Sequence, residues 1–355
     1  MTGSSERRFG PARLQDGVAP RHAWGLMYAS FVTIGLATGI AVLTPYVLTT
    51  NLGIAQAAQG TALGTLAIAQ ELALLVGFAL FGALADKIGR RAVYVMGMVL
   101  LTLGYLFYGF AGTMAALVGW RLVYALGIGA ATGMFGTVIS DYAVVADRGK
   151  LTALCGFLNG LGVVVVAIFL GKLPALFAAR GATAPGAGQE SLAVVAGLAA
   201  FSAVVLWLLL KPGVPAATDR RKPLLALLGE GVAAGRANRR IALSYAAAFV
   251  ARGDIAIVGL FAIAWGNQAA IADGYSTAQA ASKGNLPFVI AQSTALFWPA
   301  VIAWPLDRMA RMRALALTMA LGALGYGALG LVSDPLAPGA VPFFMALGIG
   351  QISAL

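Results

Sequence analysis

The chain contains a succession of apolar stretches, each about as long as a helix must be to cross a lipid bilayer. A membrane-spanning helix needs roughly 20 consecutive, mostly apolar residues, which satisfy their own backbone hydrogen bonds. We predict nine complete spans, and a tenth that begins near Val341 and is still running at Leu355. The nine are residues 24–48, 60–84, 92–111, 114–139, 151–171, 191–210, 241–266, 286–306 and 314–333.

The composition indicates that most of the protein surface faces lipid. Of the 355 residues, 60% are hydrophobic and 10% are charged, whereas a soluble domain has about a quarter charged residues. The formal charge of +11 lies between the apolar stretches rather than on one solvated domain, which argues against nucleic acid as a partner. The single Cys155 and the single His22, placed in the N-terminal tail, leave no set of metal ligands, and we expect no metal and no cofactor.

The positions of lysine and arginine predict the orientation of the chain. With the N-terminus inside, 19 basic residues fall on inner segments and three on outer segments. Inner loops are enriched in these residues, so we predict a cytoplasmic N-terminus and a bacterial cytoplasmic (inner) membrane. The predicted parts are a cytoplasmic tail (1–23), a six-helix bundle (24–210), a cytoplasmic linker (211–240) and an incomplete second bundle (241–355). Within the linker, residues 224–235 could form a short helix at the membrane surface.

The loop between the second and third spans carries a family signature. Residues 82–91 read GALADKIGRR and match the pattern G-x-x-x-D-[RK]-x-G-[RK]-[RK] at every defined position. In this signature the chain resembles the major facilitator superfamily. A weaker echo, with alanine in place of both glycines, follows the eighth span. The positions matched in the two loops are Gly82, Asp86, Lys87, Gly89, Arg90, Arg91, Asp307, Arg308 and Arg311.

The resemblance implies an all-α membrane protein with two six-helix bundles (6+6), in which these loops act as a gate. It implies a secondary active transporter, not an enzyme, that moves a small organic solute by alternating access, coupled to protons, as a monomer. Drug or metabolite efflux and a non-transporting sensor on the same fold are the alternatives. A twelve-span member would continue for about two helices beyond Leu355, so the resemblance also implies a truncated chain.

Ionisable residues deep within spans are costly unless they are paired or hydrated, so they are candidates for function. We expect Asp254 or Glu71 to take up a proton, with an arginine holding the unloaded acid ionised; a static ion pair is the alternative. Two arginines hint at an anionic solute, and two acids hint equally at a proton or an organic cation. The resemblance implies that helices one, four, seven and ten line the central cavity, which places Arg121, Arg252 and Asp254 on cavity-lining helices and Glu71, on helix two, against the other half. The four residues are Glu71, Arg121, Arg252 and Asp254.

Pairs of glycines four residues apart predict close helix packing, because a helix without side chains at these positions can be approached closely. The pairs are Gly35/Gly39, Gly129/Gly133 and Gly156/Gly160.

Overall fold

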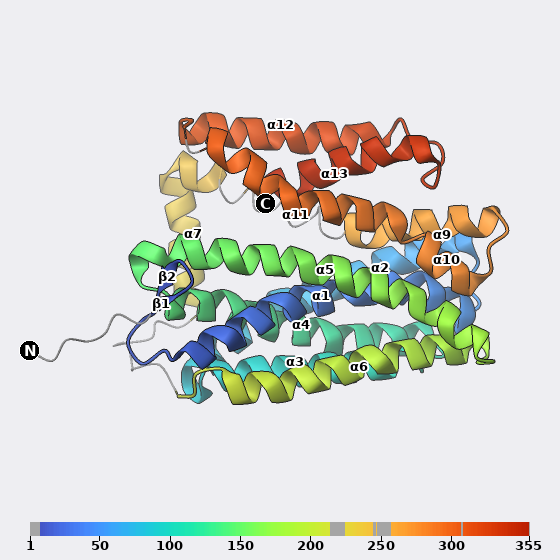
Figure 1. Ribbon diagram of the computed structural model, residues 1–355, viewed down its shortest axis with the longest axis horizontal. Helices are drawn as coiled ribbons and strands as arrows, with labels where there is room; N and C mark the ends of the chain where they lie inside the picture. Colours follow the sequence, from blue (N-terminus) through green and yellow to red (C-terminus); the bar gives the residue numbers. More distant parts are fainter. Residues whose placement is uncertain (1–7, 214–223, 244–245, 247–256, 307, 355) are drawn as a thin grey trace, which may run out of the picture. The chain divides into compact units, whose positions relative to one another are not determined.

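The computed structural model describes residues 8–213, 224–243, 246, 257–306 and 308–354 (Figure 1). The chain divides into two compact units. The N-terminal unit comprises Met1–Pro215 together with Gly274–Ser282, and the C-terminal unit comprises Ala216–Asp273 and Lys283–Leu355.

Six long helices build the described part of the N-terminal unit (Figure 1). Helix α1 packs against α5 and α6, α3 against α4 and α6, and α2 against α4. At about 1.5 Å per residue, the 31 residues of α1 extend over about 46 Å, more than the roughly 30 Å of a bilayer's hydrocarbon core. The helices are α1 (Pro20–Thr50), α2 (Gln56–Ile88), α3 (Arg90–Tyr108), α4 (Met114–Tyr142), α5 (Arg148–Ala179, preceded by the 3-10 turn η1, Val145–Asp147) and α6 (Ala184–Leu209).

In the C-terminal unit, α13 packs against α11 and α12. A π-helical segment, η2, leads into α9 in the described residues. The elements beyond residue 213 are α7 (Leu224–Ala237), η2 (Ile257–Ala262), α9 (Ile263–Ala272), α10 (Thr277–Lys283), α11 (Leu286–Leu306), α12 (Arg311–Leu329), η3 (Pro338–Ala340) and α13 (Val341–Ala354).

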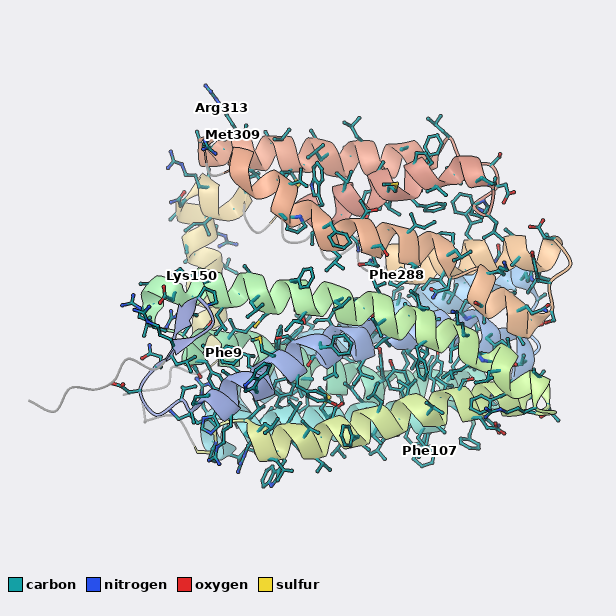
Figure 2. The ribbon with its side chains drawn as sticks, viewed as in Figure 1. Phe9, Phe107, Lys150, Phe288, Met309 and Arg313 are labelled. Atoms are coloured by element: carbon teal, nitrogen blue, oxygen red, sulfur yellow. The ribbon has the colours of Figure 1, made fainter. Side chains whose placement is uncertain are left out.

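The predicted all-α membrane architecture is confirmed. Eight helices in the described residues are long and apolar enough to cross a membrane, and a shorter apolar helix covers Pro338–Ile352. The predicted span 241–266 falls largely outside the described residues. Large apolar side chains such as Leu75 on α2 are exposed, as a lipid-facing surface requires. Phe107, labelled in Figure 2, is 37% exposed and stacks on Trp120 with ring centroids 4.6 Å apart.

Helices α1 and α5 approach each other at two glycines. A Cβ placed on Gly35 would lie 2.8 Å from the carbonyl oxygen of Gly162, and one placed on Gly162 would collide with the carbonyl oxygen of Phe31. The close packing predicted at Gly35 is thus present, with Gly162 as its partner, whereas the close packing predicted at Gly156 is absent from the described residues. A Cβ on Gly156 would meet no atom within 4 Å.

This contact predicts that Gly162→Ala destabilises the protein, whereas Gly156→Ala on the same helix does not. The added methyl group at 162 forces α1 and α5 apart, and overpacking of this kind costs about 1–3 kcal/mol. Thermal unfolding of the purified variants in detergent measures the difference. Equal melting temperatures for the two variants would show that α1 and α5 are not packed at Gly162.

The segment before α1 is folded onto the ends of α4, α5 and α6. Strands β1 (Arg8–Phe9) and β2 (Ala12–Arg13) form an antiparallel hairpin, and Leu14 makes a β-bridge to Ala143. The Gln15 N–H donates to the Tyr142 carbonyl oxygen (2.9 Å), and the Val144 N–H donates to that of Arg13 (3.1 Å).

Asp147 anchors this segment through its carboxylate. The backbone N–H of Arg13 donates to Oδ2 at 3.0 Å, its Nε donates to the same oxygen at 2.8 Å, and Lys150 Nζ donates to Oδ1 at 2.8 Å. Asp147 is buried, so these charge-assisted bonds replace the water that it has lost.

His22 lies within α1 and is buried, although we expected it in a polar tail. Its Nδ1 accepts a hydrogen bond from the Ala19 N–H at 3.1 Å, so the ring satisfies a backbone donor at the start of the helix. The structure therefore assigns His22 to the helix cap.

The anchor predicts that Asp147→Asn exposes the N-terminal segment to protease. Trypsin can cleave after Arg13 only when the flanking backbone leaves its hydrogen bonds, so loss of the charge should speed this cleavage severalfold. Cleavage after the exposed Arg180 provides an internal reference. The control is Glu190→Gln, which removes an exposed carboxylate with no ion pair among the described residues. Equal cleavage in both variants would show that Asp147 does not hold the segment.

Candidate functional site

The signature loop forms the turn between α2 and α3. Gly89 ends α2 and precedes α3 with φ of 94°, a conformation that residues with a side chain rarely adopt. A tight turn is therefore present at Gly89. Its N–H donates to the Ala85 carbonyl oxygen at 3.0 Å, which closes the last turn of α2.

Two arginines after the turn tie it to α4 and α6. Arg90 forms an ion pair with Asp141 near the end of α4. Arg91 Nη1 donates to the Trp207 carbonyl oxygen at 3.0 Å, and the guanidinium carbon lies 4.3 Å from the centroid of the Trp207 ring. Together these contacts fix the loop to its own unit, and Trp207 has no counterpart in the signature.

The other signature residues lie nearer the surface. A Cβ on Gly82 would meet no atom within 4 Å, Asp86 is half-buried, and Lys87 is exposed. In the second loop Arg308 is exposed and Arg311 begins α12, while Asp307 lies outside the described residues. The gating role of both loops stays a prediction.

Arg121 is a charged residue buried within a membrane-spanning helix of the N-terminal unit. It lies in α4, about 10 Å from the start of the helix at 1.5 Å per residue, and is only 2% exposed. Its guanidinium carbon lies 5.5 Å from the ring centroid of Tyr124, and the Tyr108 hydroxyl is close enough to interact with it. It forms no ion pair with a carboxylate in the described residues, and its Nε and Nη1 have no hydrogen-bond partner there.

Tyrosine hydroxyls connect this arginine's surroundings to α1. Tyr105 from α3 and Tyr124 from α4 both donate to the carbonyl oxygen of Leu36, at 2.5 and 2.9 Å. The two rings meet edge to face, with centroids 5.3 Å apart. Tyr108 lies 3.3 Å from Thr44 Oγ1. We name Arg121, Tyr105, Tyr108 and Tyr124, with Thr44, the arginine–tyrosine cluster.

Sequence reasoning missed these tyrosines, although one signal was available. Tyr105 and Tyr108 are three residues apart, so a helix places them on one face. Tyr124 is three residues from Arg121 on the next span, by the same rule. Their meeting with Arg121 depends on how α3 packs against α4, which no local pattern specifies.

Of the other three predicted intramembrane charges, the structure describes only Glu71. Glu71 lies on α2 and is half-buried. Arg252 and Asp254 lie outside the described residues. In the C-terminal unit a separate polar contact joins two helices: Gln292 Nε2 on α11 donates to Gln351 Oε1 on α13 at 3.0 Å.

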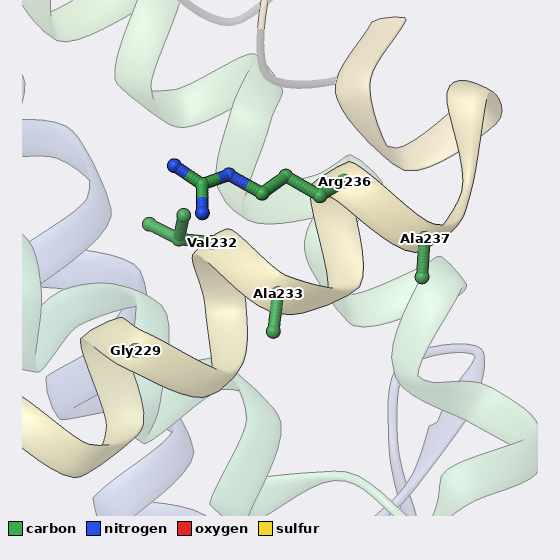
Figure 3. A pocket seen from close by; sticks show the side chains of 5 residues that line it. All are labelled: Gly229, Val232, Ala233, Arg236 and Ala237. Atoms are coloured by element: carbon green, nitrogen blue, oxygen red, sulfur yellow. The ribbon is translucent and has the colours of Figure 1, made fainter.

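A shallow hollow runs along one face of α7 (Figure 3). Helix α7 is present where a short helix was predicted over residues 224–235, and its place at the membrane surface stays a prediction. The hollow includes none of the predicted site residues. All of its lining comes from this single helix, so it does not converge on a ligand. The lining residues are Gly229, Val232, Ala233, Arg236 and Ala237.

The long apolar helices define an integral membrane protein. The chain belongs to the Major Facilitator Superfamily, whose family model matches residues 26–355.

Two curated relatives are magnetosome proteins of Paramagnetospirillum magneticum. MamZ is 26% identical over 337 residues, covering 90% of this chain and 50% of MamZ. MamH is 25% identical over 312 residues, covering 84% of this chain and 68% of MamH. The chain thus spans about half the length of MamZ. Among solved structures, the nucleoside transporter NupG superposes with a TM-score of 0.69 at 16% identity, over 94% of this chain and 79% of NupG, which shows the shared fold.

The loop contacts predict a measurable coupling between Arg90 and Asp141. Their side chains are 23% and 43% exposed, so solvent screens the pair and the coupling should stay below about 1 kcal/mol. A double-mutant cycle with Arg90→Gln and Asp141→Asn, followed by thermal unfolding, measures it. Lys87→Gln with Asp141→Asn is the matched control and should be additive. Additivity in both cycles would exclude the ion pair as a tie between α3 and α4.

Proposed function

We propose that this membrane transporter is a secondary active carrier that moves a small organic solute by alternating access, coupled to protons. The family match and the fold support transport, and the intramembrane acids Glu71 and Asp254 support the coupling. An acid in a partly dry site binds a proton more tightly, and a nearby cation reverses this effect. Approach and withdrawal of an arginine would therefore release and load the proton.

The single observation that carries the proposal is the buried charge in the N-terminal unit. Arg121 is 2% exposed within an apolar helix. Charged residues within membrane spans are rare and usually mark functional sites. A scaffold protein would be more stable with an apolar residue of similar volume at this position.

We further propose that the signature loops act as a gate on the cytoplasmic side, where the N-terminus also lies. The 19 basic residues on the inner segments support this orientation, and a bacterial inner membrane is the location that we infer. The names of the two magnetosome proteins state an organelle rather than a solute, so they support no particular substrate.

Proton coupling predicts the behaviour of Asp254→Asn and Glu71→Gln. In proteoliposomes with an internal pH-sensitive dye, addition of a transported solute should move protons with the wild-type chain. The variant that removes the coupling acid should lose this proton flux and pH-driven accumulation, because an amide cannot carry the proton.

Facilitated equilibration of radiolabelled solute should remain in that variant, since the solute site is intact. Glu190→Gln, at the exposed start of α6, is the control and should behave as wild type. Full pH-driven uptake in both acid variants would remove these two acids from the mechanism and assign the coupling to another group. Absence of pH-driven uptake by the wild-type chain would leave uniport as the mode of transport.

A further inference from the structure

Arg121 is a cation that the N-terminal unit buries without a carboxylate from the described residues. A guanidinium keeps its proton in proteins, so burial cannot be relieved by neutralisation. Removal of such an ion from water is strongly unfavourable unless another group replaces the lost hydration. Nε and Nη1 nevertheless have no hydrogen-bond partner in the described part of the chain. The arginine–tyrosine cluster therefore has an excess of donors.

Two of the tyrosine hydroxyls do not relieve this excess. Tyr105 and Tyr124 commit their protons to the Leu36 carbonyl oxygen at 2.5 and 2.9 Å. The Tyr124 ring gives the guanidinium an electron-rich face, with its centroid 5.5 Å from the guanidinium carbon. Ring faces attract the cation but do not accept its N–H groups along their axes as an oxygen atom does.

The third hydroxyl is free to turn toward a better acceptor. Thr44 Oγ1 donates its only proton to the Ile40 carbonyl oxygen at 2.8 Å, so in its contact with Tyr108 it must accept. That contact is 3.3 Å long, well beyond the usual 2.7–2.8 Å of an O–H···O bond. Tyr108 therefore holds a weakly used O–H donor beside Arg121.

We propose that Arg121 and Tyr108 together bind an oxyanion group, a carboxylate or a phosphate, of the solute that this transporter carries. The inference rests on the transport function proposed above and names its substrate class. A fixed cation with unpaired N–H groups and a spare O–H donor offers charge and geometry to an oxyanion. It repels an organic cation, and a neutral solute would leave the charge uncompensated.

The burial of the cluster gives the binding a conformational consequence. With 2% of Arg121 exposed, an anion reaches it only when the side chains that cover it move aside. Binding therefore selects a conformation of the N-terminal unit in which this cluster is open. An oxyanion would both neutralise the arginine and shift the population of states.

Thermal stability of the purified full chain in detergent tests this inference without any need for transport. The probes are acetate, succinate, glucose 6-phosphate and inorganic phosphate, added at constant ionic strength, with glucose as the neutral control. A ligand that binds the folded state raises the melting temperature with its concentration. At least one oxyanion should do so, and glucose should not. Stabilisation by the organic anions assigns the site to an organic solute, and stabilisation by phosphate alone assigns it to the inorganic ion.

Paired variants separate the site from general stability. Arg121→Gln should abolish the oxyanion-dependent shift, and Tyr108→Phe should weaken apparent affinity about tenfold, as loss of one bond to a charged group predicts. Tyr94→Phe deletes a buried hydroxyl from the same helix, α3, that contacts Thr33 Oγ1 at 2.6 Å outside the cluster, so it should keep the wild-type affinity. If Arg121→Gln does not fold, the comparison of Tyr108→Phe with Tyr94→Phe still decides.

An absent shift with every oxyanion, or an equal shift in the wild type and Arg121→Gln, overturns the inference. Water would then be the partner of the buried guanidinium. This outcome is distinct from failure of the proposed function. Oxyanion binding without flux in proteoliposomes would reject transport and keep the site, whereas flux of a neutral solute without oxyanion binding would reject the site and keep transport.

Discussion

A helix in lipid gains little from placing apolar side chains against another helix, because the lipid tails are equally apolar. Close backbone approach and hydrogen bonds must then hold the helices together. In the N-terminal unit several such contacts fall on one turn of α1. Gly35 meets Gly162 of α5, Gly39 leaves room for the Tyr105 hydroxyl, and Leu36 between them accepts two tyrosine hydroxyls. This turn joins α1 to α3, α4 and α5.

The same turn connects packing to the candidate site. Tyr105 and Tyr124 are held on the Leu36 carbonyl oxygen, and Tyr124 in turn presents its ring to Arg121. A change in the position of α1 at this turn would therefore move the Tyr124 ring that faces the cation. Because packed cores switch between discrete arrangements rather than deform continuously, the cluster is suited to having a closed and an open form.

The sequence predicted the helices well and their contacts poorly, and the reason is physical. Spans are local: about 20 apolar residues suffice, so α1 to α6 lie close to the predicted ranges. Gly89 was also predictable, because a tight turn between two helices requires φ that glycine adopts. The partner of Gly35 was not predictable, since Gly162 and Gly156 look alike in sequence and only the crossing of α1 and α5 distinguishes them.

The same limit applies to the charges. The sequence shows that Arg121 lies within a span, where burying its charge is costly. It does not show whether a carboxylate or a set of tyrosines lies beside that charge. The distinction changes the chemistry. A site in which an arginine pairs with an internal acid has no net charge with or without a ligand, whereas a site in which an arginine lies among tyrosines has a net positive charge until an anion binds.

Under the proposed mechanism, this difference in net charge would make reorientation of the carrier depend on whether solute is bound. A lone charge that moves through the membrane field exchanges about 2.3 kcal/mol per 100 mV with it, and a neutral pair exchanges nothing. The empty and loaded forms would therefore respond differently to the membrane potential. The charge of Arg121 would then favour reorientation of the carrier when solute is bound. The intramembrane acids would couple that reorientation to the proton gradient, which sets the direction of net transport.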